Sequence, residues 1–132
     1  MDPPCVLVVD DSPTIRKLVE ITLRRQGFQV VFAENGITTL AALTRHRPDL
    51  IILDIMLPAI NGYQICQVIK RHPQCRGIPV LMLSGKDGAF AKVRGRMVGA
   101  SEYVTKPFTP SELLAAVGRY VPAPSPPAEA RA

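Results

Sequence analysis

The sequence has no tryptophan, few aromatic residues, only three cysteines and no hydrophobic run long enough to span a membrane. Cys5, Cys66 and Cys75 form an odd and widely spaced set, which argues against a disulfide framework and against a zinc site of closely spaced cysteines. A membrane-spanning helix needs about 20 consecutive apolar residues, and no secretion signal opens the chain. These absences predict a soluble, cytoplasmic protein with buried or partly buried thiols.

The composition is that of one globular domain. The chain has 132 residues, of which 47% are hydrophobic and 20% charged, so it can bury about two-thirds of the surface that its unfolded form exposes. Its net charge is +5. Because the cations are spread over several segments, we expect ordinary solvated faces and no direct nucleic-acid binding. An acidic protein partner is an equally good explanation of any basic patch that survives folding.

The hydrophobic pattern predicts a parallel sheet. Three short stretches are continuously apolar, at residues 5–9, 50–53 and 80–83, and such runs are typical of strands buried on both faces. Two further strands are predicted at residues 28–33 and 102–105. Helical spacing separates the strands, so we expect a doubly wound α/β domain of five strands and five helices with right-handed crossovers.

Capping signals mark the ends of the helices. Ser12 and Pro13 open the first helix, which stops near Gly27. Asn35 caps the second, and Thr109 with Glu112 forms a capping box for the last. The second helix carries Ile37, Leu40 and Leu43, the third carries Ile65, Val68 and Ile69, and a fourth begins at Asp87 or Gly88 with Phe90, Val93 and Met97 on one side. The domain is expected over residues 1–121, followed by a disordered, proline-rich tail at residues 122–132.

Polar residues follow the predicted strands where each one ends. They are Asp10 and Asp11 after the first strand, Asp54 after the third, Ser84 after the fourth and Lys106 after the fifth. Any one of them could be a helix cap or a turn residue. Because the carboxyl ends of parallel strands share one edge of the sheet, however, we expect all five to converge there.

This set of side chains is suited to a metal ion and a phosphoryl group. Carboxylates without histidine or cysteine are hard oxygen ligands that favour Mg²⁺, and two of them about 5 Å apart repel by ~3 kcal/mol at an effective dielectric of 20. Asp54 stands alone at the end of a central strand, which makes it the best nucleophile. The adjacent pair Asp10 and Asp11 is suited to holding the metal, and Ser84 and Lys106 are suited to contacting phosphate oxygens.

These residues closely resemble the receiver domain of bacterial two-component response regulators, the CheY-like family. The matching segments are Val8-Val9-Asp10-Asp11-Ser12, Leu53-Asp54-Ile55-Met56-Leu57-Pro58, Asn61-Gly62-Tyr63, Met82-Leu83-Ser84 and Tyr103-Val104-Thr105-Lys106-Pro107-Phe108. The resemblance covers about residues 5–121. It implies strand order 2-1-3-4-5 and a phosphoacceptor at Asp54, served by a sensor histidine kinase or a histidine phosphotransfer protein.

The resemblance also implies roles for the other site residues. Asp11, Asp54 and the backbone carbonyl of Met56 would bind Mg²⁺, with Asp10 helping through water. Ser84 and Lys106 would contact the phosphoryl group, and Ser84 and Tyr103 would form the switch to the surface around the fourth helix and fifth strand. Lys106-Pro107 is expected to be cis, and Met56 and Lys86 resemble positions that tune phosphate lifetime.

A narrower likeness is to the stand-alone receivers of twitching-motility and chemosensory systems, of the PilG type. It rests on the run Ser84 to Phe90 with Lys92, Gly95-Arg96, Val98-Gly99 and Tyr103 to Phe108. It favours a signalling domain that is not an enzyme beyond its own phosphotransfer and dephosphorylation. We expect the domain to act on a downstream protein of unknown identity. We also expect it to be a monomer or a phosphorylation-dependent dimer. The basic fourth helix could dock an acidic partner, although a solvated helix face is the simpler interpretation.

Three other function classes stay open. A Mg²⁺-dependent phosphohydrolase would also form an aspartyl phosphate, but such enzymes usually need an acid two residues after the nucleophile, where this chain has Met56. The chain could be the receiver fragment of a DNA-binding regulator, although no helix-turn-helix follows the tail. A flavodoxin-like nucleotide binder lacks support, because an acidic pair replaces the glycine-rich loop after the first strand.

Overall fold

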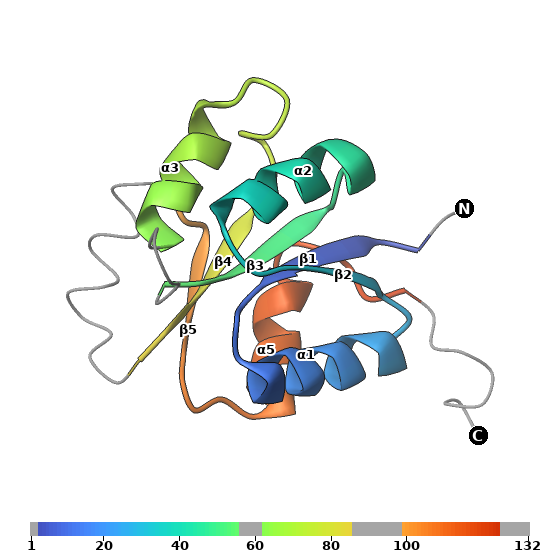
Figure 1. Ribbon diagram of the computed structural model, residues 1–132. Coiled ribbons are helices and arrows are strands. Elements are labelled where there is room, and N and C mark those ends of the chain that lie inside the picture. The colour runs from blue at the N-terminus through green and yellow to red at the C-terminus, as the bar shows by residue number, and fades with distance from the viewer. Residues whose placement is uncertain (1–2, 56–61, 86–98, 125–132) are drawn as a thin grey trace.

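The computed structural model describes residues 3–55, 62–85 and 99–124, and Figure 1 shows a central sheet with helices packed on both of its faces. The strands are β1 (Cys5–Val9), β2 (Gln29–Ala33), β3 (Leu50–Asp54), β4 (Val80–Ser84) and β5 (Glu102–Thr105). They pair in parallel in the order β2-β1-β3-β4-β5. The predicted fold class and strand order are both confirmed.

The alternation of side chains along the strands divides the core into two layers. Every residue of β1, β3 and β4 is buried, and successive residues of a strand point to opposite faces. Val8, Ile52 and Leu83 belong to one layer, whereas Leu7, Ile51 and Met82 belong to the other. This explains why these strands are apolar throughout instead of alternating with polar residues.

Four helices lie within the described residues and cover the two faces in pairs (Figure 1). α1 (Pro13–Arg25) and α5 (Pro110–Gly118) pack on one face, and α2 (Gly36–His46) and α3 (Gly62–Arg71) pack on the other. The fourth helix that we predict after Asp87 lies outside the described residues. The doubly wound arrangement therefore puts the carboxyl end of every strand at one edge of the domain.

The predicted helix caps are present. Ser12 accepts a hydrogen bond from the backbone N–H of Ile15 at the start of α1. Asn35 with Thr38 and Thr109 with Glu112 form reciprocal capping boxes at α2 and α5. Gly27 follows α1 with a φ of 91°, a left-handed conformation that glycine adopts without steric cost.

The buried faces of two helices differ from the predicted pattern. In α2, Ile37 is 83% and Leu40 42% exposed, and the helix packs through Thr39, Ala42 and Leu43 instead. In α3, Val68 is exposed while Ile65, Cys66 and Ile69 are buried. The reason is geometric, since a helix with several apolar positions can bury only the stripe that the sheet meets.

Two smaller findings concern the strands and the thiols. The second strand begins at Gln29 and not at Phe28, because the N–H of Phe28 bonds to the carbonyl of Leu23 and closes α1. The three cysteines are free and buried, as predicted. Across the described segments, no helix combines the length and the apolar character required to cross a bilayer.

The packing of α2 predicts a sharp contrast between two of its apolar residues. Leu43 is 4% exposed and Ile37 83%, so Leu43→Ala should lower the free energy of unfolding by about 2–5 kcal/mol. Ile37→Ala should change it by less than about 0.5 kcal/mol. Urea denaturation followed by circular dichroism measures both. Equal losses in the two variants would contradict the observed orientation of α2.

Candidate functional site

Three carboxylates meet at the carboxyl edge of the sheet. Asp10 and Asp11 follow β1, and Asp54 is the last residue of the neighbouring strand β3. One carboxylate oxygen of each lies within 4.8 Å of the others. Asp10 and Asp54 are buried, whereas Asp11 is exposed. The predicted convergence of these acids is therefore present in the structure.

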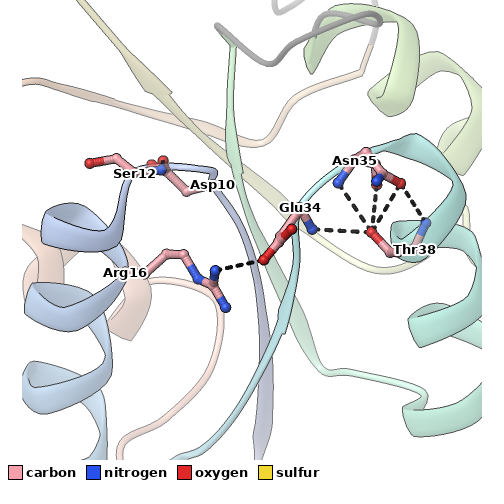
Figure 2. A network of polar contacts seen from close by, with 6 residues as sticks. All are labelled: Asp10, Ser12, Arg16, Glu34, Asn35 and Thr38. Carbon is pink, nitrogen blue, oxygen red and sulfur yellow. Dashed lines mark hydrogen bonds and ion pairs between the residues drawn. The ribbon is translucent and has the colours of Figure 1, made fainter.

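Asp10 is held in place by the start of α1. Its Oδ1 accepts a hydrogen bond of 2.8 Å from the backbone N–H of Ser12, and Figure 2 shows the two residues side by side. A second set of contacts in the same view joins Arg16 to Glu34 at 3.1 Å and Glu34 N–H to the Thr38 hydroxyl. These contacts tie the first turn of α1 to the loop after β2.

Lys106 supplies the positive charge. Its Nζ lies 3.5 Å from Asp10 Oδ2 and 3.4 Å from Asp54 Oδ1, and its side chain is 26% exposed. The backbone N–H of Lys106 also bonds to the carbonyl of Ser84 at 2.6 Å, and the bond to Pro107 is cis, as expected. Within the described ranges, Lys106 is the cation that pairs with these carboxylates.

Ser84 brings an unpaired hydroxyl to the same edge. The residue is buried at the end of β4, next to β3 in the sheet. Its Oγ has no hydrogen-bond partner among the groups that the structure describes. Because an unsatisfied buried hydroxyl costs free energy, this atom is suited to a ligand oxygen that completes the site.

The donor set fits a hard divalent cation. Three carboxylates against one ammonium leave the site with excess negative charge. Their nearest oxygens lie within 4.8 Å of one another, and two unit charges about 5 Å apart repel by ~3 kcal/mol at an effective dielectric of 20. Carboxylate oxygens without histidine or thiolate are the ligands that Mg²⁺ prefers. Met56, whose carbonyl we expect as a further ligand, lies outside the described residues, as does Lys86.

Tyr103 lies on β5 and contacts a residue to which the sequence assigned no role. Its hydroxyl is 2.9 Å from that of Tyr63 on α3. Burial, followed by the contacts with Tyr63, raises the pKa of Tyr103 above its ordinary value, so the Tyr103 phenol stays protonated at neutral pH. In the sequence, Tyr63 was noted only as part of the Asn61-Gly62-Tyr63 segment that supports the family resemblance.

Gly62 is a second residue whose importance only the structure reveals. A Cβ atom at this position would lie 2.5 Å from the backbone oxygen of Asp54 and 2.8 Å from Cα of Ile55. The N–H of Gly62 bonds to the carbonyl of Ile55 at 2.9 Å. The start of α3 therefore packs directly against the backbone that carries Asp54, and there is no room for a side chain.

Comparison with known proteins identifies relatives of this chain. Residues 6–118 match the family described as "Response regulator receiver domain". Protein PilG of Pseudomonas aeruginosa is 45% identical over 117 residues, which cover 89% of this chain and 87% of that protein. The DNA-binding response regulator MtrA of Mycolicibacterium smegmatis and the DNA-binding transcriptional regulator RpaA of Synechocystis also match, at 41% and 42% identity. The chain spans about half of their length.

Solved structures agree with this result. Chemotaxis response regulator CheY4 of Vibrio cholerae has a TM-score of 0.85 and 34% identity, with coverage of 90% of this chain and 99% of that one. The receiver domain of sensor histidine kinase PA1611 from Pseudomonas aeruginosa has a TM-score of 0.81 and 27% identity, with coverage of 89% and 97%. That structure has a magnesium ion coordinated in its active-site cleft.

The close approach at Gly62 predicts that a single methyl group is not tolerated. Gly62→Ala should lower the free energy of unfolding by about 1–3 kcal/mol, because the added carbon displaces the Asp54 backbone. Gly77→Ala is the matched control, since a Cβ there meets nothing within 4 Å, and it should leave stability unchanged or slightly raised. Chemical denaturation compares the two. Equal stability of both variants would show that the contact with Asp54 is not limiting.

Proposed function

Because the chain belongs to the family of response regulator receiver domains, we propose that it is a phosphorylation-operated switch whose phosphoacceptor is Asp54. The observation that carries this proposal is the position of Asp54. Its strand β3 lies between β1, which leads into the acidic pair, and β4, which supplies Ser84. Of the three acids, Asp54 alone thus stands between the acidic pair that follows β1 and the strands that carry the groups suited to phosphate.

The surroundings of the other two acids favour the same assignment. One oxygen of Asp10 accepts from Ser12 N–H and the other pairs with Lys106, and the residue is 0% exposed. Asp11 is exposed and has no ion pair with Lys106 among the described residues. Asp10 and Asp11 therefore suit the role of metal ligands, and Asp54 suits that of the nucleophile.

The proposed reaction is a phosphoryl transfer from a phosphohistidine. A carboxylate oxygen of Asp54 forms a bond to phosphorus while the P–N bond breaks, and its electron pair stays with the imidazole, which then takes a proton. The ammonium of Lys106 and the hydroxyl of Ser84 donate hydrogen bonds to the phosphoryl oxygens as their charge grows. The product is an acyl phosphate on Asp54.

The residues present fit Mg²⁺ as the metal of this site. Asp10, Asp11, Asp54 and the carbonyl of Met56 would hold it, and when bound it offsets the negative charge that the phosphoryl group brings. The receiver of PA1611 with its coordinated magnesium supports this choice. Lys106 already offsets part of the repulsion between Asp10 and Asp54, at 3.5 and 3.4 Å.

We assign the output of the switch to Tyr103. It sits on β5, and the residue paired with Ser84 in the β4–β5 register is Thr105, two positions further along the strand. A phosphoryl group that engages Ser84 therefore acts next to the strand that carries Tyr103. The change is a shift between two conformations that differ in affinity for a partner protein.

The relatives support a proposal for the partners and the pathway of this chain. Receiver domains are phosphorylated by histidine kinases, and we propose a sensor histidine kinase or a histidine phosphotransfer protein as donor. The likeness to PilG and to a chemotaxis regulator supports motility or chemosensory signalling. We propose a signalling domain at residues 1–121, acting as a monomer or a phosphorylation-dependent dimer, with catalysis limited to its own phosphotransfer and dephosphorylation. We propose residues 122–132 as a tail outside this domain, of which residues 125–132 lie outside the described residues.

The phosphoacceptor is tested with acetyl phosphate and Mg²⁺. The unmodified sequence should gain the mass of one phosphoryl group, and Asp54→Ala should gain none, because the nucleophile is removed. Asp49→Asn is the control, since it alters an aspartate just before β3 whose Oδ2 accepts a hydrogen bond from Cys5 N–H, and it should be modified normally. Intact-protein mass spectrometry gives the result. Modification that persists in Asp54→Ala would place the nucleophile elsewhere.

The role of Lys106 predicts opposite effects on metal binding and on transfer. Lys106→Met should bind Mg²⁺ at least as tightly, because a positive charge beside the carboxylates is lost. Its rate of phosphorylation by acetyl phosphate should fall by ~10²-fold, the usual effect of removing one donor to a developing anion. Calorimetry measures the first and mass spectrometry the second. Lys17→Met, which removes a lysine that is 71% exposed on α1, should change neither.

A further inference from the structure

A hollow of about 440 Å³ lies between the end of α2 and the segment that joins α3 to β4. Its volume is within the range of ligand-binding pockets. Apolar side chains from both segments line it, together with polar groups at its margin. The lining residues are Leu43, Thr44, Arg47, Pro48, His72, Gln74, Cys75 and Ile78.

The chain around this hollow is basic and contains no acid. Residues 35–48 and 62–84 have no aspartate or glutamate, and their cations are Arg45, Arg47, Lys70, Arg71 and Arg76. Asp49 is the acid next to this region, and its Oδ2 accepts a hydrogen bond from Cys5 N–H. The layer formed by α2 and α3 is therefore positively charged without internal compensation.

The opposite layer shows that this is not a general property of the surface. On α1, Arg16, Lys17 and Arg24 each pair with a glutamate, and Arg119 after α5 pairs with Glu102. Within the part of the chain that the structure describes, Arg45, Arg47, Arg71 and Arg76 form no ion pair. Arg47 lines the hollow, and Arg45, Arg71 and Arg76 are each one or two residues from a lining residue in the sequence. Guanidinium groups without an internal partner are suited to carboxylates from another molecule.

Two polar residues of the lining point to the same ligand. Arg47 ends α2 with φ 46° and ψ 65°, a left-handed conformation in which glycine or asparagine is favoured and a long side chain is strained. Arg47 thus lines the hollow in a conformation in which its Cβ atom carries a steric cost. His72 accepts a hydrogen bond from Gln74 N–H at its Nδ1, 3.2 Å away, so its neutral ring carries the proton on Nε2 as a donor.

We propose that this hollow binds an acidic segment of a partner protein, with one apolar side chain entering between Leu43 and Ile78 and flanking carboxylates meeting Arg47 and the neighbouring cations. The apolar lining favours a peptide over nucleic acid, whose phosphates need a track of charge but no apolar floor. Charge complementarity identifies the occupant: the surface has cations in excess, and its partner must supply acids.

The hollow and the carboxylate site are at opposite ends of the sheet. Pro48 and Ile78 precede β3 and β4, whereas Asp54 and Ser84 end them. Strands of five residues rise about 3.3 Å per residue, which separates the two sites by roughly 13–17 Å. An acidic partner can therefore occupy the hollow without covering the site of phosphorylation, and this interaction does not depend on the proposed phosphotransfer.

The test uses a synthetic peptide of four glutamates around a central leucine, titrated into the ¹⁵N-labelled protein and followed by NMR. We expect saturable shifts that centre on the amides of Thr44, Arg47, Gln74 and Cys75. A peptide with serine in place of leucine should bind more weakly, and one with lysines in place of the glutamates should not bind. Absence of saturable shifts, or shifts that centre on α1, would overturn the proposal.

Arg47→Gly separates binding from folding. Glycine relieves the left-handed strain, so the variant should unfold at the same or a higher temperature than the parent, yet bind the leucine peptide about tenfold more weakly because a charge-assisted hydrogen bond is lost. Arg25→Ala is the matched control, since it also removes an exposed arginine that has no ion pair with any described residue, and on the opposite layer. It should bind as the parent does.

The remaining outcomes are equally decisive. An equal loss of binding in Arg47→Gly and Arg25→Ala would show attraction by net charge alone and would overturn the site. If a short oligothymidylate binds the same residues more tightly than the leucine peptide does, the proposed ligand is wrong and the hollow binds nucleic acid. Unchanged binding by Arg47→Gly would show that the guanidinium of Arg47 does not contact the peptide. That result would overturn the role that the proposal gives to Arg47.

Discussion

The chemistry of this protein depends on the repulsion between three acids that the parallel sheet brings together at one edge. Asp10, Asp11 and Asp54 are within 4.8 Å of one another by one oxygen each, and Asp10 and Asp54 are buried. Lys106 meets two of them from the end of β5. One ammonium cannot balance three carboxylates, so the residues present fit a divalent cation, which together with Lys106 would offset the charge of a phosphoryl group.

The same sheet explains why chemistry and docking can be separated. Its parallel strands place all carboxyl ends at one edge, where the acids gather, and all amino ends at the other, where the hollow beside Arg47 lies. The two helical layers differ as well. Cations on α1 are mostly paired with glutamates, whereas those of the α2 and α3 layer have no acids beside them. One small domain thus presents two surfaces of different chemistry.

Much of the fold was predictable because it rests on local patterns. Apolar runs at β1, β3 and β4, the cap at Ser12 and the box at Thr109 depend on neighbours in sequence. The exposure of Ile37 was not predictable, because α2 has apolar residues on more than one face and the sheet covers one of them. Nor was the contact between Tyr63 and Tyr103, 40 residues apart and joined only when α3 packs beside β5.

The sequence by itself determined the strands, the family resemblance with the strand order that it implies, and the acids, lysine and serine at the strand ends. These side chains share an edge because parallel strands all end on the same side of the sheet. Only the tertiary structure decided which of these groups touch, that Ser84 Oγ has no partner among the described residues, that Gly62 lies against the Asp54 backbone, and that Arg47 lines a hollow beside Leu43 and Ile78. The physical reason is that distances between segments remote in sequence arise from packing, and no local pattern encodes them.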